Sequence, residues 1–232
     1  MSAGIGRYLG SSVLRKQLVA ITGLVMVGFV VAHLSGNLLI YGGPDVFNAY
    51  AQKLQDIAPL LWVMRVGLII STALHIVLTM TLVLENNAAR GRSYQVGRSK
   101  EPRSFATQTM RYSGILIILF VALHLYDFTF ASKTGPGSVV AGLNDGKSLE
   151  LFGLVWNGFK QGWRSVIYVL AVSSVGLHLS HGIQSVFQTV GFNHERYTPI
   201  IRKASIAVGV LVALGFASLP IYVLLAKVPF GV

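Results

Sequence analysis

Long apolar runs separated by short polar segments dominate the chain. A helix that crosses a bilayer needs about 20 predominantly apolar residues, and its backbone groups must be hydrogen-bonded without help from water. The runs are too long and too continuous for the alternating strands of a membrane barrel. We therefore predict an all-α integral membrane bundle of five transmembrane helices, with spans at roughly 17–41, 60–84, 111–131, 164–190 and 203–226.

The connections between the spans carry predictions of their own. Asp127 interrupts the third apolar run, and we place its carboxylate near the membrane interface. The segment 41–59 has a turn composition followed by a short interfacial helix pattern, and 132–161 is typical of a Gly-rich external loop with an amphipathic element near 149–159. No internal repeat is clear, and residues 1–232 are expected to form a single transmembrane domain.

Composition agrees with a protein dissolved in lipid. The chain is 53% hydrophobic and 12% charged, and its mean hydropathy is +0.63. It has no cysteine, which excludes disulfides, covalently attached haem and any iron–sulfur cluster held by its own thiolates. Redox chemistry in this chain must therefore use a non-covalent cofactor.

The net charge of +11 is distributed unevenly between the two ends of the predicted spans. One side receives twelve basic residues: Arg7, Arg15, Lys16, Arg90, Arg92, Arg98, Lys100, Arg103, Arg111, Arg196, Arg202 and Lys203. The other side receives seven: Lys53, Arg65, Lys133, Lys147, Lys160, Arg164 and Lys227. The positive-inside rule predicts a cytoplasmic N-terminus and an external C-terminus. Topology and anionic membrane lipid explain the basic excess, so we expect no nucleic-acid partner.

Five of the six histidines lie inside the apolar spans: His33, His75, His124, His178 and His181. Ionisable residues at membrane depth are costly, and they mark ion pathways, proton relays or cofactors. Neutral imidazole is also a haem-iron ligand, and two such ligands from facing helices bind a six-coordinate electron-transfer haem. A single histidine in a span is more often a hydrogen-bonded packing residue, so the argument depends on the whole set.

The depths of these histidines group them into pairs. At 1.5 Å per residue, His33 lies about 24 Å and His124 about 20 Å from the inner end of the helix. His75 lies about 15 Å, His178 about 18 Å and His181 about 14 Å from that end. Two stacked haems need this arrangement, with one iron between the first and third spans and another between the second and fourth. We name His33 and His124 the outer pair, and His75 and His178 the inner pair.

The residues one turn before the histidines differ between the pairs. Both outer histidines follow Phe at i−4, whereas both inner histidines follow Ser, namely Ser71 and Ser174. Such a Ser can orient the imidazole through its second nitrogen. Nearby small residues would let a flat macrocycle approach the backbone: Gly36, Ala73, Ala122, Gly176 and Gly182. A transporter or proton channel with a histidine relay is the alternative, but it would be expected to use acidic residues at mid-depth, and only Asp127 approaches the membrane.

Local motifs along nearly the whole chain allow comparison with a family. They are Ser11-Ser12 with Arg15-Lys16, Thr22-Gly23-Leu24, His33-Leu34-Ser35-Gly36-Asn37, Gly43-Pro44-Asp45, Phe47-Asn48-Ala49-Tyr50, Thr109-Met110-Arg111-Tyr112-Ser113-Gly114, His124-Leu125, His178-Leu179-Ser180-His181-Gly182 and Phe187-Gln188-Thr189. Together they resemble the di-haem cytochrome b membrane anchor of succinate:quinone oxidoreductases, that is, succinate dehydrogenase and fumarate reductase. Anchors of hydrogenase or formate dehydrogenase also use transmembrane histidines, but the order of the motifs disfavours them.

The resemblance implies a function and a set of ligands. In that family four helices supply four haem ligands, and the matching positions here are His33, His75, His124 and His178, which would bind the iron of two b haems. The resemblance implies a flavoprotein subunit with FAD and an iron–sulfur subunit as partners, and it implies quinone, specifically menaquinone, as the electron acceptor. It also implies a place in the bacterial cytoplasmic membrane, in complexes that can assemble further. His181 would contact a propionate or the quinone.

Polar residues near the two membrane faces are candidates for further contacts. The candidates for propionate or quinone on the inner side are His181, Arg15, Gln17, Arg111 and Tyr112. Those on the outer side are Asn37, Tyr41 and Asp127. As alternatives, Arg15 and Arg111 can be snorkelling interface anchors, and Asp127 can be a carboxylate paired with Lys133 or Arg65.

Overall fold

A computed structural model describes residues 11–89 and 105–227 of the chain, and these residues form helices and loops without a named strand. The helices are α2 (Ser12–Asn37), α3 (Gly43–Asp56), α4 (Ala58–Ala89), α5 (Phe105–His124), α6 (Glu150–Lys160), α7 (Gly162–Thr189) and α8 (Thr198–Leu225). Short helical turns are η1 (Leu38–Gly42), η2 (Leu125–Thr129), η3 (Pro136–Ser138) and η4 (Asn144–Gly146). The basic residues Arg7, Arg90, Arg92, Arg98, Lys100 and Arg103, which contribute to the predicted orientation, lie outside the described ranges.

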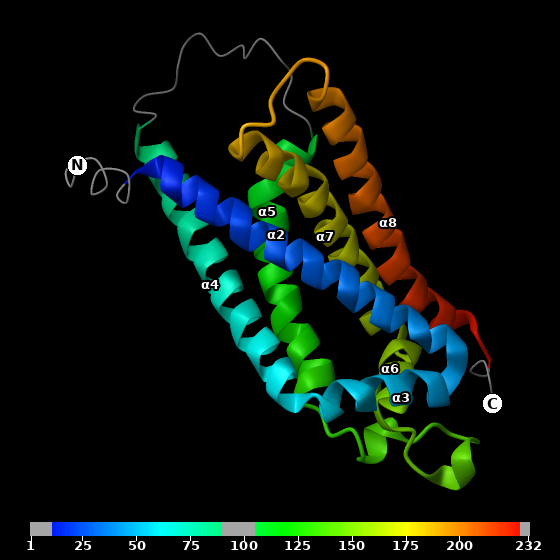
Figure 1. The fold of residues 1–232 in the computed structure, drawn as a ribbon. Helices are drawn as coiled ribbons and strands as arrows, with labels where there is room; N and C mark the ends of the chain where they lie inside the picture. Colours follow the sequence, from blue (N-terminus) through cyan, green and yellow to red (C-terminus); the bar gives the residue numbers. More distant parts are fainter. Residues whose placement is uncertain (1–10, 90–104, 228–232) are drawn as a thin grey trace.

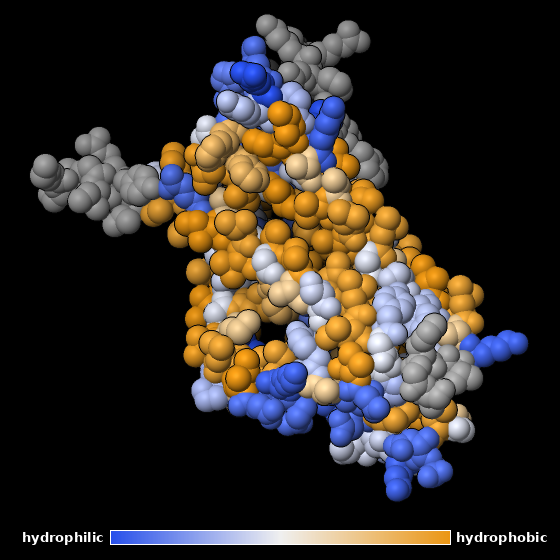
Figure 2. Space-filling view, turned by 45° about the vertical axis from the view of Figure 1, so that its right-hand side comes forward, coloured by the Kyte–Doolittle hydropathy of each residue, from blue (hydrophilic) through white to orange (hydrophobic). Residues whose placement is uncertain are grey.

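Five helical segments of the described chain are long and apolar enough to cross a membrane. Figure 2 shows their side chains as a hydrophobic band between two hydrophilic ends. Large apolar side chains on this band point outward, as at Val63 and Leu225, which is favourable in hydrocarbon and costly in water. The predicted all-α bundle of five transmembrane helices is confirmed, and the protein is an integral membrane protein.

The bundle is organised around α7 and α2 (Figure 1). Helix α7 packs against α8, α5 and α2, and α2 packs in turn against α4. Among the described elements, α4 approaches the backbones of α2 and α3 closely but makes no comparable contact with α5 or α7. The four helices that carry histidines therefore form two close pairs, α2 with α4 and α5 with α7, which meet through α2 and α7.

One end of the bundle is closed by a cap of α3, α6 and the loop between η2 and α6, at the bottom of Figure 1. Its core is aromatic and aliphatic, and Phe152 in it is fully buried. The Asn48 side chain joins the two short helices, because it donates to the Leu149 carbonyl at 3.0 Å and accepts from the Phe152 amide at 3.0 Å. The short helix predicted within 41–59 is confirmed as α3, and the amphipathic element predicted near 149–159 is the helix α6. We call the end that these two helices close the cap end, and the opposite end the far end.

Helix α8 carries no histidine but lies very close to α7. A Cβ atom on Gly209 would lie 2.4 Å from the Gly176 carbonyl oxygen, so only glycine permits this approach. Gly36 likewise faces the Tyr50 ring of α3. Gly36 and Gly176, which we predicted to make room for a macrocycle, therefore make room for contacts between helices.

Candidate functional site

The outer pair comes together between α2 and α5. The ring centroids of His33 and His124 lie 5.8 Å apart, and their planes cross at 84°. Phe29 stacks on His33 at 5.2 Å, and Phe120 lies 5.8 Å from His124, so each i−4 phenylalanine packs on its histidine. The structure brings together the two side chains that the depth argument pairs.

The polar surroundings of the outer pair are sparse. The Asn37 amide donates to the His33 carbonyl at 2.7 Å and lies 3.3 and 3.4 Å from the two ring nitrogens of that histidine. His124 Nδ1 is buried and has no hydrogen-bond partner in the described part of the chain. Buried polar atoms nearly always have partners, so the outer pair lacks a hydrogen bond that a buried imidazole would ordinarily make.

The inner pair has a different environment. His75 Nδ1 lies 3.1 Å from the Val19 carbonyl and 3.2 Å from Thr22 Oγ1, both on α2. His178 Nδ1 lies 3.2 Å from Ser113 Oγ on α5. Each inner histidine is therefore held by a hydroxyl from the neighbouring helix of its own pair.

The serines at i−4 do not hold the inner histidines. Ser174 Oγ donates to the Leu170 carbonyl of its own helix at 3.2 Å, and the contact to His178 comes from Ser113 instead. For His75, the contacting hydroxyl is that of Thr22 rather than Ser71. The prediction that these serines orient the imidazoles is wrong because the donors and acceptors that reach Nδ1 belong to another helix.

A repeated sequence pattern identifies those hydroxyls. Thr22-Gly23 precedes His33 by the same spacing as Ser113-Gly114 precedes His124, and a Phe occupies the same position in between. Both glycines face an inner ring, since a Cβ on Gly23 would lie 3.3 Å from His75 Cε1 and one on Gly114 would lie 3.6 Å from His178 Cε1. Helices α2 and α5 thus share one spacing of hydroxyl residue, Gly, Phe and His, which the sequence predictions did not use.

Asp127 lies next to the outer pair, in the π-helical turn η2. Its carboxylate is 3% exposed, pairs with Arg164 at 3.2 Å and accepts a hydrogen bond from Tyr168 Oη at 2.9 Å. The Tyr168 ring lies 6.1 Å from the His124 ring. The alternative pairing of Asp127 with Lys133 or Arg65 is wrong, because its carboxylate instead contacts Arg164 and Tyr168 on α7.

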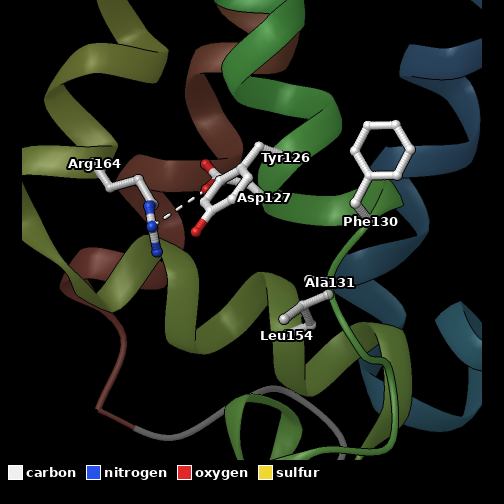
Figure 3. A pocket seen from close by; sticks show the side chains of 6 residues that line it. All are labelled: Tyr126, Asp127, Phe130, Ala131, Leu154 and Arg164. Atoms are coloured by element: carbon white, nitrogen blue, oxygen red, sulfur yellow. Dashed lines mark ion pairs between the residues drawn. The ribbon is translucent and has the colours of Figure 1, made fainter.

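A cavity of about 300 Å³ opens beside this ion pair (Figure 3). Its lining consists of Tyr126, Asp127, Phe130, Ala131, Leu154 and Arg164. Arg164 Nε is buried and lacks a hydrogen-bond partner among the residues described. The cavity therefore combines aromatic and aliphatic walls with one carboxylate and one guanidinium.

The other predicted contact residues are dispersed. Tyr41 Oη donates to Ser218 Oγ at 2.7 Å, away from the cavity. Arg15 at the far end forms an ion pair of 2.5 Å with Glu85, which joins α2 to α4. The remaining inner candidates lie on α2, α5 and α7: Gln17, Arg111, Tyr112 and His181.

The donor set fits haem better than a bare metal ion. No group of three or more His, Cys, Asp or Glu side chains within 11–89 and 105–227 is arranged to hold a metal. A six-coordinate haem requires two facing imidazoles from the protein, since the macrocycle supplies the rest. The 5.8 Å separation of the His33 and His124 rings fits this requirement.

A family comparison agrees with this geometry. Residues 85–217, more than half of the chain, match the family model described as the succinate dehydrogenase/fumarate reductase transmembrane subunit. The chain belongs to this family. No curated protein and no solved structure matches it.

The match to the succinate dehydrogenase/fumarate reductase transmembrane subunit family covers some of the predicted site residues and not others. The matched residues include His124, His178 and Asp127, together with the part of α8 up to residue 217. His33 and His75 lie before the match, and their assignment depends on the contacts described above. The repeated pattern links the two halves, because each helix pair supplies one outer and one inner histidine.

Proposed function

We propose that this chain is the membrane anchor and electron-transfer subunit of a succinate:quinone oxidoreductase, with two b haems that, when bound, carry single electrons between an iron–sulfur subunit and a quinone, specifically menaquinone. The observation that carries the proposal is the contact between the His33 and His124 rings from two different helices, each of which also holds one inner histidine. Membership of the family supplies the catalytic context, since members are parts of succinate dehydrogenase or fumarate reductase complexes.

In this proposal His33 and His124 hold the outer haem and His75 and His178 hold the inner haem. The limited contact of α4 with α5 and α7 supports a macrocycle between the two helix pairs. His181, Arg15, Gln17, Arg111 and Tyr112 remain candidates for inner propionate or quinone contacts. Arg15 would have to exchange its pairing with Glu85 to take that role.

The Asp127 cavity is the strongest candidate for an outer quinone or propionate contact. Quinone carbonyls accept hydrogen bonds, and the buried Arg164 Nε is a donor at the wall of the cavity. Tyr126 and Phe130 supply aromatic surface beside it. Asn37 and Tyr41 are weaker candidates, because their polar groups contact His33 and Ser218.

We further propose that the chain is a single domain in the bacterial cytoplasmic membrane, with the far end in the cytoplasm. The basic residues predicted for that side favour this orientation. The far end would then dock the iron–sulfur subunit, which in turn carries the FAD-containing flavoprotein. Complexes of this kind can associate into higher oligomers.

The test is a reduced-minus-oxidised spectrum with haem quantification on the purified complex. We expect two b haems per chain, and loss of one haem in each of His33→Ala, His75→Ala, His124→Ala and His178→Ala. The matched control is His181→Ala, which should retain both haems. A complex without haem would overturn the proposal and favour a histidine-relay transporter.

A further inference from the structure

We infer that Thr22 and Ser113 are positioning residues that fix the tautomer of the inner histidines, with Nδ1 protonated and Nε2 free to bind iron. The inference rests on the proposed haem-binding function and adds two residues to it. Neither hydroxyl is a ligand. Each acts through the imidazole of the neighbouring helix.

Hydrogen-bond accounting determines the tautomer of His75. The single hydroxyl hydrogen of Thr22 is donated to the Leu18 carbonyl at 2.7 Å. Thr22 Oγ1 must therefore accept in its 3.2 Å contact with His75 Nδ1. The Val19 carbonyl, 3.1 Å from the same nitrogen, can only accept. Both contacts require a proton on Nδ1, which leaves the Nε2 lone pair for a metal.

The same accounting applies to His178. Ser113 Oγ donates to the Met110 carbonyl at 3.0 Å, so it must accept from His178 Nδ1 at 3.2 Å. In both halves the inner histidine thus donates to a hydroxyl whose own hydrogen goes to a carbonyl of its own helix. This correspondence makes a chance contact a poor explanation.

The outer pair lacks this arrangement. His124 Nδ1 has no partner among the described residues, and the polar neighbour of His33 is an amide of its own helix. Hydrogen bonding of the second ring nitrogen orients a ligating histidine and raises its basicity. The inner site is therefore pre-organised by Thr22 and Ser113, whereas the outer site is shaped by aromatic packing.

The experiment uses the whole complex with Thr22→Val and Ser113→Ala. The inner haem is identified as the component lost in His75→Ala and His178→Ala. Loss of an outer-shell partner typically weakens metal binding about 10–100-fold. We therefore expect 10–100-fold weaker retention of the inner haem on detergent dilution. A histidine that donates less electron density also binds ferric iron less tightly relative to ferrous iron. Each tenfold loss in this ratio of affinities raises the midpoint potential of the inner haem by about 59 mV.

Matched variants separate positioning from general structure. Thr22→Ser and Ser113→Thr keep the hydroxyl and should restore the wild-type potential of the inner haem. Thr81→Val and Ser173→Ala remove exposed hydroxyls that donate only to carbonyls of their own helices, and they should change nothing. The outer-haem potential should stay unchanged throughout, which a global loss of folding would not produce.

The possible outcomes are distinct. A wild-type complex with two haems, whose inner potential and retention are unaffected in Thr22→Val and Ser113→Ala, would overturn this inference and leave the proposed function standing. An equal shift in both haems would also overturn it. A wild-type complex that binds no haem would overturn the proposed function first, and this inference with it.

Discussion

The inner and outer histidine pairs use the same side chains in different ways. The inner rings are held through Nδ1 by hydroxyl and carbonyl groups of a neighbouring helix. The outer rings are packed among phenylalanines, and Phe128 beside His124 contacts Phe159 of the cap end. The comparison teaches that a ligand in hydrocarbon can be oriented by a few strong polar contacts or by many weak aromatic ones. The polar contacts of the inner pair depend on the register between neighbouring helices. The aromatic contacts of the outer pair depend on the cap end.

The largest effect is expected when one histidine of either pair is replaced by alanine. His124→Ala should remove the outer haem and leave the inner one, because the inner ligands lie on α4 and α7 and are held by Thr22 and Ser113 rather than by His124. His178→Ala should do the reverse. Haem quantification and the reduced-minus-oxidised spectrum measure both. Loss of both haems in either variant would show that the two sites are not independent.

Asp127→Asn should disturb only the outer region. The substitution leaves the Arg164 guanidinium without its carboxylate, and breaking a largely buried pair costs up to about 3 kcal/mol. Thermal unfolding of the complex and the outer-haem spectrum should both change. The exposed Asp145→Asn in η4 is the control. An altered inner-haem spectrum with an unaltered outer one would contradict the placement of Asp127.

Gly209→Val should act on the inner side through helix packing. A side chain there would collide with the Gly176 carbonyl and displace α7 close to His178, and such overpacking costs about 1–3 kcal/mol. We expect a lower unfolding temperature and a shifted inner-haem spectrum. The matched control is Gly67→Val on α4, since a Cβ there meets no atom within 4 Å. Equal effects of the two variants would indicate a propensity effect rather than a collision.

The smallest effect is expected at the far end. Arg15→Gln removes a partly exposed ion pair with Glu85, and such pairs contribute less than about 1 kcal/mol. Both haems should be retained, and the small loss of thermal stability should vanish at high salt. Loss of the inner haem would instead assign Arg15 to a propionate.

Much of the fold follows from local sequence. The apolar runs predicted five spanning helices, and the turn and amphipathic patterns predicted α3 and α6, because helix periodicity and the demand for internal hydrogen bonds act within each segment. The spacing of the histidines along those helices also determined their depths. The pairing of His33 with His124 followed from depth alone, and the structure brings these rings together.

Contacts between helices were decided only by tertiary structure. The rotation of each helix about its axis selected Thr22 and Ser113, rather than Ser71 and Ser174, as neighbours of the inner rings. The wider turn at η2 selected Arg164 over Lys133 or Arg65 as the partner of Asp127. The residues of each helix determine which polar groups it carries, but packing against neighbouring helices determines which of those groups face the histidines. That packing is a property of several distant segments together, and no single segment of the sequence contains it.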